Sequence, residues 1–420
     1  MSGDVLRIWL SSTVYGDTAP FYMEAFKKLG AELKLNIELK TIPWNRSADS
    51  LISAFKNGNP PDIIEVGTTF VQTLAHLGYL ASVPGDMDIK PSLADWVDGN
   101  CTYKGRKVAV PWFADTIIMA ARQDILDRYG ISRESISDGE GFFRVCELLA
   151  DNGRKKKDDN NRFLPLVFPI RPENGTFRCY VSWLLSSGWH FPLLTPIPEY
   201  IFEDDNVIRT FEYISKLMQV SGITIKDARL HPQHLFEQFS TQGRYVFFIG
   251  NWGGALSDII RHPKPDANHE ATFSIIPIPS LSPSGSSWGG GTDLTVSSTT
   301  KHSEAAWKVV EYMLSDSFMD LWTSNSGDIP AFESSFWERK SNDRQLSIMY
   351  DQIKKSESYP LHPLWIRLEK YMSEEFANFL WRVMNGKMSD SETSIRSIMQ
   401  HMDNGLADFL KMTWEMDNAK

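Results

Sequence analysis

At 420 residues, with 42% hydrophobic and 23% charged residues, the chain has the composition of a globular protein and the length of two domains. No run approaches the ~18 apolar residues that a membrane helix needs. The net charge of −10 argues against nucleic acid or anionic lipid as a partner, because both are bound by basic surfaces. The three cysteines have no framework-like or metal-like spacing, so we expect buried thiols.

The first eighty residues alternate between strand and helix patterns. The strand patterns lie at 5–10, 36–41 and 62–66, with loops at 11–13 and 67–69. The helical patterns lie at 18–34, 48–56 and 70–77. This order indicates a parallel sheet covered by helices, and ligands collect at the carboxyl ends of such strands. The candidate binding residues at those ends are Thr13, Trp44, Thr68 and Thr69.

Residues 104–126 hold a strand that we expect to cross between two lobes. Its first part alternates as a half-buried strand does, and Pro111 is expected to end the regular ladder because it has no N–H to donate. A second apolar run, 117–121, begins shortly after Trp112 and Asp115. Such a segment leaves one sheet and enters another without a linker. We therefore expect a cleft beside Trp112 and Asp115.

Beyond this crossing, strands and helices continue to alternate. Strands are expected at 163–170, 244–249, 273–279 and 292–297. Helices are expected at 141–150, 208–220, 235–239 and 303–314, and over most of the chain after 330. The Ser-, Pro- and Gly-rich stretch 280–291 is expected to hold a second crossing, and a third is expected near 327–330.

The common catalytic motifs are absent from the sequence. There is no nucleophile elbow, zincin motif, P-loop or dinucleotide fingerprint, and the glycine run 289–291 lacks the lysine and the following helix of a phosphate loop. His231, His234 and Glu237 have metal-like helical spacing, but a proline follows the first histidine and nothing nearby completes a site. We therefore expect neither a metal nor a cofactor.

Tryptophans in loop contexts are the positive signal. Trp44, Trp112, Trp252 and Trp288 each stand next to a proline, a glycine or a strand end, where binding residues gather. Sugars have apolar C–H faces and a rim of hydroxyls, so aromatic rings cover the faces and planar polar groups take the hydroxyls. Trp252 is expected to face a ligand, because the glycines after it leave its ring little to pack on. For Trp44 and Trp288, a place in the core is an equal alternative.

Seven segments, in this order and spacing, resemble the extracellular solute-binding proteins of ABC importers. The likeness is to their maltose-binding-protein-like, carbohydrate-binding branch, family 1, and it covers nearly the whole chain. The segments are LRIW, NPPDIIEV, LGYL, YKGRKVAVPWFADT, RYVFFIGNWGG, WGGGTDLTVSSTTKHSEAAWKVVEYMLS and PLHPLWIRLEKYMSEEFANFLWRVMNGKMSDSE.

The resemblance implies the two-lobed α/β fold of class II periplasmic binding proteins. Each lobe is a sheet flanked by helices, three crossings join the lobes, and the ligand cleft between them closes by a hinge. The N-terminal lobe would comprise 1–112 and 281–329. The C-terminal lobe would comprise 113–280 and 330–420.

The resemblance also implies roles for individual residues. Trp252 looks like the family's principal stacking ring, Asp115 like its acidic hydroxyl acceptor, and Trp365 like a second ring. The second lobe would offer the loop 171–174 as a binding loop. The remaining candidate ligand contacts are Thr13, Trp44, Thr68, Thr69, Trp112, Glu173, Asn174, Trp288 and Gly290.

The implied function is that of the substrate-binding component of an ABC sugar importer. It would capture a di- or oligosaccharide, deliver it to the transmembrane subunits of the permease, and work as a monomer without catalysis. The implied location is extracellular, as a membrane-anchored lipoprotein or periplasmic, although the family's signal segment and lipid-carrying cysteine are absent from this sequence. Hydroxyls at Thr13, Thr68 and Thr69, where maltose-binding relatives often carry charge, argue against maltose.

Two alternatives remain open. The first is a carbohydrate-active enzyme with Asp115 and Glu173 as its carboxylate pair. The second is a binding protein for a non-sugar solute such as a peptide or a polyamine. A basic ligand of that kind would want more carboxylates in the cleft than Asp115 and Glu173.

Overall fold

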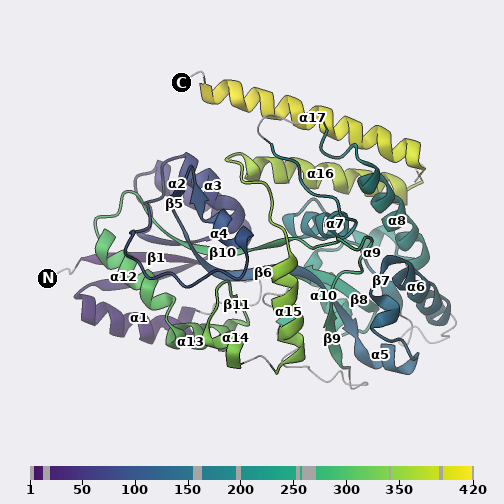
Figure 1. Cartoon of the computed structure of the whole chain (residues 1–420), viewed down its shortest axis with the longest axis horizontal. Helices are drawn as coiled ribbons and strands as arrows, with labels where there is room; N and C mark the ends of the chain where they lie inside the picture. Colours follow the sequence, from purple (N-terminus) through teal and green to yellow (C-terminus); the bar gives the residue numbers. More distant parts are fainter. Residues whose placement is uncertain are drawn as a thin grey trace. The chain divides into compact units, whose positions relative to one another are not determined.

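The computed structural model describes residues 4–12, 19–154, 163–194, 200–251, 256–257, 271–339, 342–386 and 391–418. The chain forms two compact units, whose elements are labelled in Figure 1. Unit 1 comprises Met1–Thr116, Trp252–Asp258 and Gly289–Ile366. Unit 2 comprises Ile117–Asn251, Ile259–Trp288 and Arg367–Lys420.

Unit 1 contains a sheet with the strand order β2-β1-β3-β10-β6, and β11 also pairs with β6. The strands are β1 (Val5–Ser12), β2 (Asn36–Pro43), β3 (Ile63–Gly67), β6 (Val110–Arg122), β10 (Gly289–Val296) and β11 (Ile329–Pro330). As predicted, β1 pairs in parallel with β2 and β3. β10 runs antiparallel to both β3 and β6. A separate short ribbon joins β4 (Thr102–Tyr103) to β5 (Arg106–Lys107).

Helices cover both faces of this sheet. On one face, Tyr22 of α1 stacks on Trp322 of α13 with ring centroids 4.0 Å apart, and Trp112 lies 4.5 Å from the same ring. The other face packs against α2 and α3, which contribute Leu51 and Phe70. The helices of unit 1 are α1 (Ala19–Leu33), α2 (Ser47–Lys56), α3 (Thr68–His76), α4 (Asp95–Asn100), α12 (Ser303–Met313), α13 (Asp316–Ser326), α14 (Ser335–Arg339) and α15 (Arg344–Lys355).

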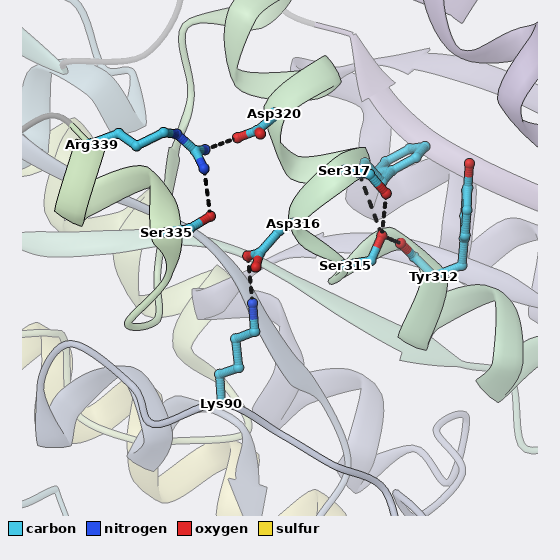
Figure 2. Close-up of polar contacts among 9 residues, drawn as sticks. Lys90, Tyr312, Ser315, Asp316, Ser317, Asp320, Ser335 and Arg339 are labelled. Carbon is cyan, nitrogen blue, oxygen red and sulfur yellow. Dashed lines mark hydrogen bonds and ion pairs between the residues drawn. The ribbon is translucent and has the colours of Figure 1, made fainter.

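Polar contacts fix α13 at its N-terminus (Figure 2). The Lys90 ammonium lies 2.6 Å from the Asp316 carboxylate, and this hydrogen bond lowers the pKa of Asp316. Arg339 contacts Asp320 and donates to the Ser335 hydroxyl at 2.8 Å. These contacts hold the helix that leads into β11, the short strand beside β6.

Three local predictions about unit 1 are wrong. β1 extends through Ser12, where a loop was expected, because it stays paired with β2 to its end. α3 begins at Thr68, because Gly67 both ends β3 and occupies the position before the helix. Pro111 lies inside β6 opposite Asp293, and the register with β10 shifts directly after it, where Trp112 is the extra residue of a bulge. Prolines in strands are found next to such irregularities.

Unit 2 contains the second half of β6, which pairs with β8 (Tyr245–Asn251) and β9 (Phe273–Ile276). β7 (Leu164–Leu166) runs parallel to β8. Phe376 of α16 lies 5.0 Å from Phe211 of α8 and 5.5 Å from Phe177 of α7, so these helices share an aromatic core. The main helices are α5 (Gln123–Arg128), α6 (Gly139–Arg154), α7 (Asn174–Ser186), α8 (Asp205–Ser221), α9 (Ile225–Ala228), α10 (Pro232–Ser240), α16 (Trp365–Met384) and α17 (Glu392–Asn418).

The chain passes between the units in β6, and the boundary falls between Thr116 and Ile117 (Figure 1). A second passage lies between Trp288 and Gly289, within the predicted stretch. Another passage lies between Ile366 and Arg367, and the segment Trp252–Asp258 adds two more boundaries, after Asn251 and before Ile259. The stretch 327–330 belongs to unit 1. There, Gly327 ends α13 with a φ of 78° and the next residues form β11 inside unit 1.

The three cysteines are free and buried, which confirms the prediction. Burial raises the pKa of each thiol, and that of Cys179 to about 12. No helix in the described part of the chain combines the length and the hydropathy that spanning a bilayer requires.

Candidate functional site

In unit 1, the structure brings Trp44 next to the start of α3. Trp44 opens a short 3-10 helix after β2, and its ring stacks on Phe70 with centroids 6.2 Å apart. A Cβ atom added to Gly67 would lie 3.0 Å from the Trp44 ring, so only glycine allows this approach. Thr68 and Thr69 are the first, buried residues of the helix. An aromatic ring therefore lies next to the first turn of α3, whose first two residues carry hydroxyls.

Asp115 and Gly290 are register partners on β6 and β10. Oδ1 of Asp115 accepts the N–H of Thr116 at 2.8 Å, and the residue is partly exposed. Gly290 is buried in the strand rather than in a loop. The structure thus places these two candidates side by side in unit 1, at the end of the strand pair where β6 leaves it.

Three of the candidate tryptophans are almost fully covered by protein. Trp112 is 0% exposed, and Trp288 and Trp365 are each 2% exposed. Trp112 packs on Trp322, and the Trp365 ring lies 4.5 Å from that of Tyr359. Such burial favours the core position for Trp288 that the sequence leaves open. Ligand contact by these three rings stays a prediction.

In unit 2, Glu173 directly precedes α7, is already paired with Arg171 and lies near the His231 ring. Arg171 donates from Nε to Glu173 Oε1 at 2.5 Å, and His231 Nε2 lies 3.8 Å from Oε2. His231 itself caps α10, because its Nδ1 accepts the N–H of Gln233 at 3.2 Å. Among the residues that the structure describes, no group of three or more metal-ligating side chains forms.

Two of the candidates, Thr13 and Trp252, lie outside the described residues, as does the side chain of Asn174. Asn251, the residue before Trp252, ends β8. A hollow of about 420 Å³ lies in unit 2 between the N-terminus of α6 and α8, and none of the candidate residues lines it.

Buried carboxyl groups are the feature that the sequence analysis missed. Glu65 on β3 accepts the N–H of Ser11 at 2.7 Å, yet burial raises its pKa to about 8, and nearby Asp328 raises it further. Asp293 on β10 lies beside Cys101, and burial raises its pKa to about 8 as well. The sequence signal for each group was one carboxylate within an apolar strand pattern, Glu65 in DIIEV and Asp293 in TDLTV.

The comparisons with known proteins agree on one group. The sequence profile of a family described as bacterial extracellular solute-binding protein matches residues 22–343. The chain is 22% identical, over 393 residues, to the diacetylchitobiose binding protein DasA of Streptomyces coelicolor, covering 92% of this chain and 86% of that protein.

Two solved structures show the same fold. One is the GacH receptor of Streptomyces glaucescens, with a TM-score of 0.77, 17% identity and coverage of 96% of this chain and 98% of that one. The other is maltose-bound MalE3 of T. maritima, with a TM-score of 0.78, 15% identity and coverage of 96% and 99%. These likenesses confirm the predicted mixed α/β fold of maltose-binding-protein-like solute-binding proteins.

Proposed function

Because the chain belongs to the bacterial extracellular solute-binding proteins, we propose that its solute is an oligosaccharide, which it delivers to an ABC importer. The observation that carries the proposal is the family match over residues 22–343. Proteins of this family bind solutes and are not enzymes. The chain is therefore an extracellular solute-binding protein, and the identity of the solute is the open question.

The relatives point to sugars as the class of solute. One is a diacetylchitobiose binding protein, one structure holds maltose, and another was determined with acarbose. On this chain, the Trp44 ring beside Thr68 and Thr69 fits a sugar, because a ring covers an apolar sugar face while hydroxyls and N–H groups take its polar rim. These features support a di- or oligosaccharide as the ligand.

The proposed mechanism is ligand-stabilised closure. The candidate contacts come from both units, with Trp44 and Asp115 in unit 1 and Glu173 in unit 2. A sugar that binds residues of both units lowers the free energy of the closed state more than that of the open state. The transmembrane subunits of a permease would then accept the sugar. The protein would work as a monomer, either held to the outside of the cell membrane by a lipid anchor or in a periplasm.

A thermal-shift screen tests the class of solute. The probes are maltotriose, N,N′-diacetylchitobiose, a β-linked glucose oligosaccharide, spermidine and a short peptide. A ligand present at about 100 times its Kd stabilises the native state by about 2.7 kcal/mol, which raises the melting temperature by several degrees. We expect such a shift with one of the sugars. A shift with only spermidine or the peptide would contradict the proposal.

Replacing Trp252 by alanine is expected to weaken binding of the sugar found in that screen by about 30-fold, the loss that a central aromatic contact carries. The melting temperature of the free protein should stay near the wild-type value, because the sequence predicts a ligand-facing ring rather than a core ring at Trp252. Isothermal titration gives the Kd. The matched control is Trp381→Ala, which changes a half-buried tryptophan on α16. This variant should bind the sugar with wild-type affinity. Wild-type affinity in Trp252→Ala would remove this residue from the site.

A further inference from the structure

A buried cation lies over the Trp288 ring in unit 2. The Arg178 guanidinium of α7 is 4.5 Å from the centre of this ring, and its Nε is 3.8 Å from Glu369 Oε1 on α16. The Glu369 side chain is 0% exposed and that of Arg178 is 11% exposed. Water screens these charges little, so the contacts are stronger than the same contacts on a surface.

The same face of α7 also holds the backbone of Trp288. Ser182 is one turn beyond Arg178, and its Oγ accepts the Trp288 N–H at 3.2 Å. The Trp288 carbonyl accepts the Ile117 N–H at 3.3 Å, and the Ser287 hydroxyl donates to the Ile117 carbonyl at 2.8 Å. α7 is thus connected to two chain segments that are far apart in sequence.

These contacts fall where the chain enters unit 2. Ile117 and Trp288 are the boundary residues of two passages, and Glu369 lies just after another, at Arg367. One helix face therefore reaches three of the five boundaries between the units. The opposite end of this connection is the N-terminus of α7, which directly follows the predicted ligand loop at 171–174.

In unit 1, separate contacts hold the other side of two passages. The Thr116 hydroxyl lies 2.8 Å from the Ser356 hydroxyl, and the Gly289 N–H donates to the Glu357 carbonyl at 2.8 Å. A Cβ atom on Gly289 would lie 2.9 Å from the Trp96 ring, so this approach requires glycine. Both strands are therefore fixed up to the boundary from the unit 1 side.

We propose that Arg178 is a positioning residue, which connects the ligand loop on α7 to the passages at Ile117, Trp288 and Arg367. It does not contact the sugar. A ligand that moves the start of α7 moves Trp288, Ile117 and the start of α16 with it, because Arg178 and Ser182 hold them to one helix face. This inference rests on the proposed function, since it makes the loop at 171–174 the sensor of bound solute.

A purely structural role and a positioning role predict different behaviour of paired substitutions. Replacing both members of a buried ion pair by apolar residues of similar size is often neutral for stability, whereas removing one member leaves an uncompensated charge. The variants are Arg178→Met, Arg178→Lys and the double variant Arg178→Met with Glu369→Met. Arg209→Met, an exposed arginine on α8, is the matched control.

Hydrogen exchange without ligand is the first measurement. In Arg178→Met, the amides of Ile117 and Trp288 should exchange about tenfold faster relative to the amides of β8, which corresponds to about 1.4 kcal/mol of lost interaction. The double variant should regain the wild-type melting temperature but keep the fast exchange at these two amides. Arg178→Lys should restore part of the protection, and Arg209→Met should behave as wild type.

The second measurement adds maltotriose or N,N′-diacetylchitobiose, whichever stabilises the wild type. In the wild type, bound sugar should slow amide exchange at Ile117 and Trp288. In the double variant, the factor by which the sugar slows this exchange should be about ten times smaller. Unchanged or uniformly raised exchange in the free Arg178→Met protein, or restored protection in the double variant, would overturn the proposal. A wild type that binds neither sugar would contradict the proposed solute, while the exchange data on the free protein would still decide the role of Arg178.

Discussion

Gly291→Ala is expected to lower the free energy of unfolding by about 4 kcal/mol or more, a loss reserved for strained backbone or severe overpacking. Gly291 lies in β10 with a φ of 144°, which side chains rarely adopt. An added Cβ atom would lie 1.9 Å from the Phe113 carbonyl oxygen and 3.0 Å from the Ala114 Cα. Both neighbours belong to the backbone of β6, so neither can rotate away. The bulge at Trp112 lies in the same strand pair.

Urea unfolding followed by circular dichroism measures this loss. The matched control is Gly99→Ala in α4, where the added Cβ atom meets nothing within 4 Å. Alanine should be neutral there or stabilise by up to about 1 kcal/mol, because it lowers the entropy of the unfolded chain. If the two variants lost equal stability, the close approach of β10 to β6 could not be the cause.

Glu65→Gln is expected to change how stability depends on pH. The pKa of Glu65 is about 8 in the folded protein against an ordinary value of 4.5, because burial disfavours the charged carboxylate. Between these two values, the native state holds a proton that the unfolded state has released. The contribution of Glu65 to the free energy of unfolding is therefore fully present below pH 4.5, falls as the pH rises, and is lost above pH 8.

Glutamine cannot titrate, so the stability of Glu65→Gln relative to the wild type should rise by about 4 kcal/mol between the two ends of that window. Urea unfolding at several pH values gives this difference directly, and Asp293→Asn should behave in the same direction. Asp205→Asn is the contrasting control. Arg396 lowers the pKa of exposed Asp205, so its small contribution is present at neutral pH and is lost on acidification. A flat difference for Glu65→Gln would mean that Glu65 is ionised in the native state.

The regular part of the fold was predictable because its signals are local. The parallel strands β1, β2 and β3 follow from apolar periodicity within each segment, and the passage through β6 follows from two adjacent apolar runs. Pro111 was misread because its place in the ladder depends on pairing with Asp293 of β10, far away in sequence. The boundary between Ile366 and Arg367 gives no such signal, because it lies inside the continuous helix α16, where composition does not change.

Individual site residues were harder to predict, since burial depends on distant elements. Trp112 has the sequence context of a loop residue, but α13 supplies Trp322 as a packing partner and encloses it. Trp288 is covered by Arg178, more than a hundred positions earlier. Trp44 stacks on Phe70 across Gly67, where a Cβ atom would lie 3.0 Å from the Trp44 ring. The local sequence indicates this contact only by having a glycine at that position. Patterns along the chain thus located the strands but could not say which rings remain accessible near their ends.

The three buried thiols have a practical consequence for following solute capture. Alkylating reagents attack the thiolate, and burial keeps Cys101, Cys146 and Cys179 protonated at neutral pH. The folded protein should therefore react slowly with maleimides. A cysteine introduced at an exposed position, such as Ser298 beside the end of β10, would then be the one site that takes up a fluorophore. The native chain can thus be labelled at one chosen position without first removing any cysteine.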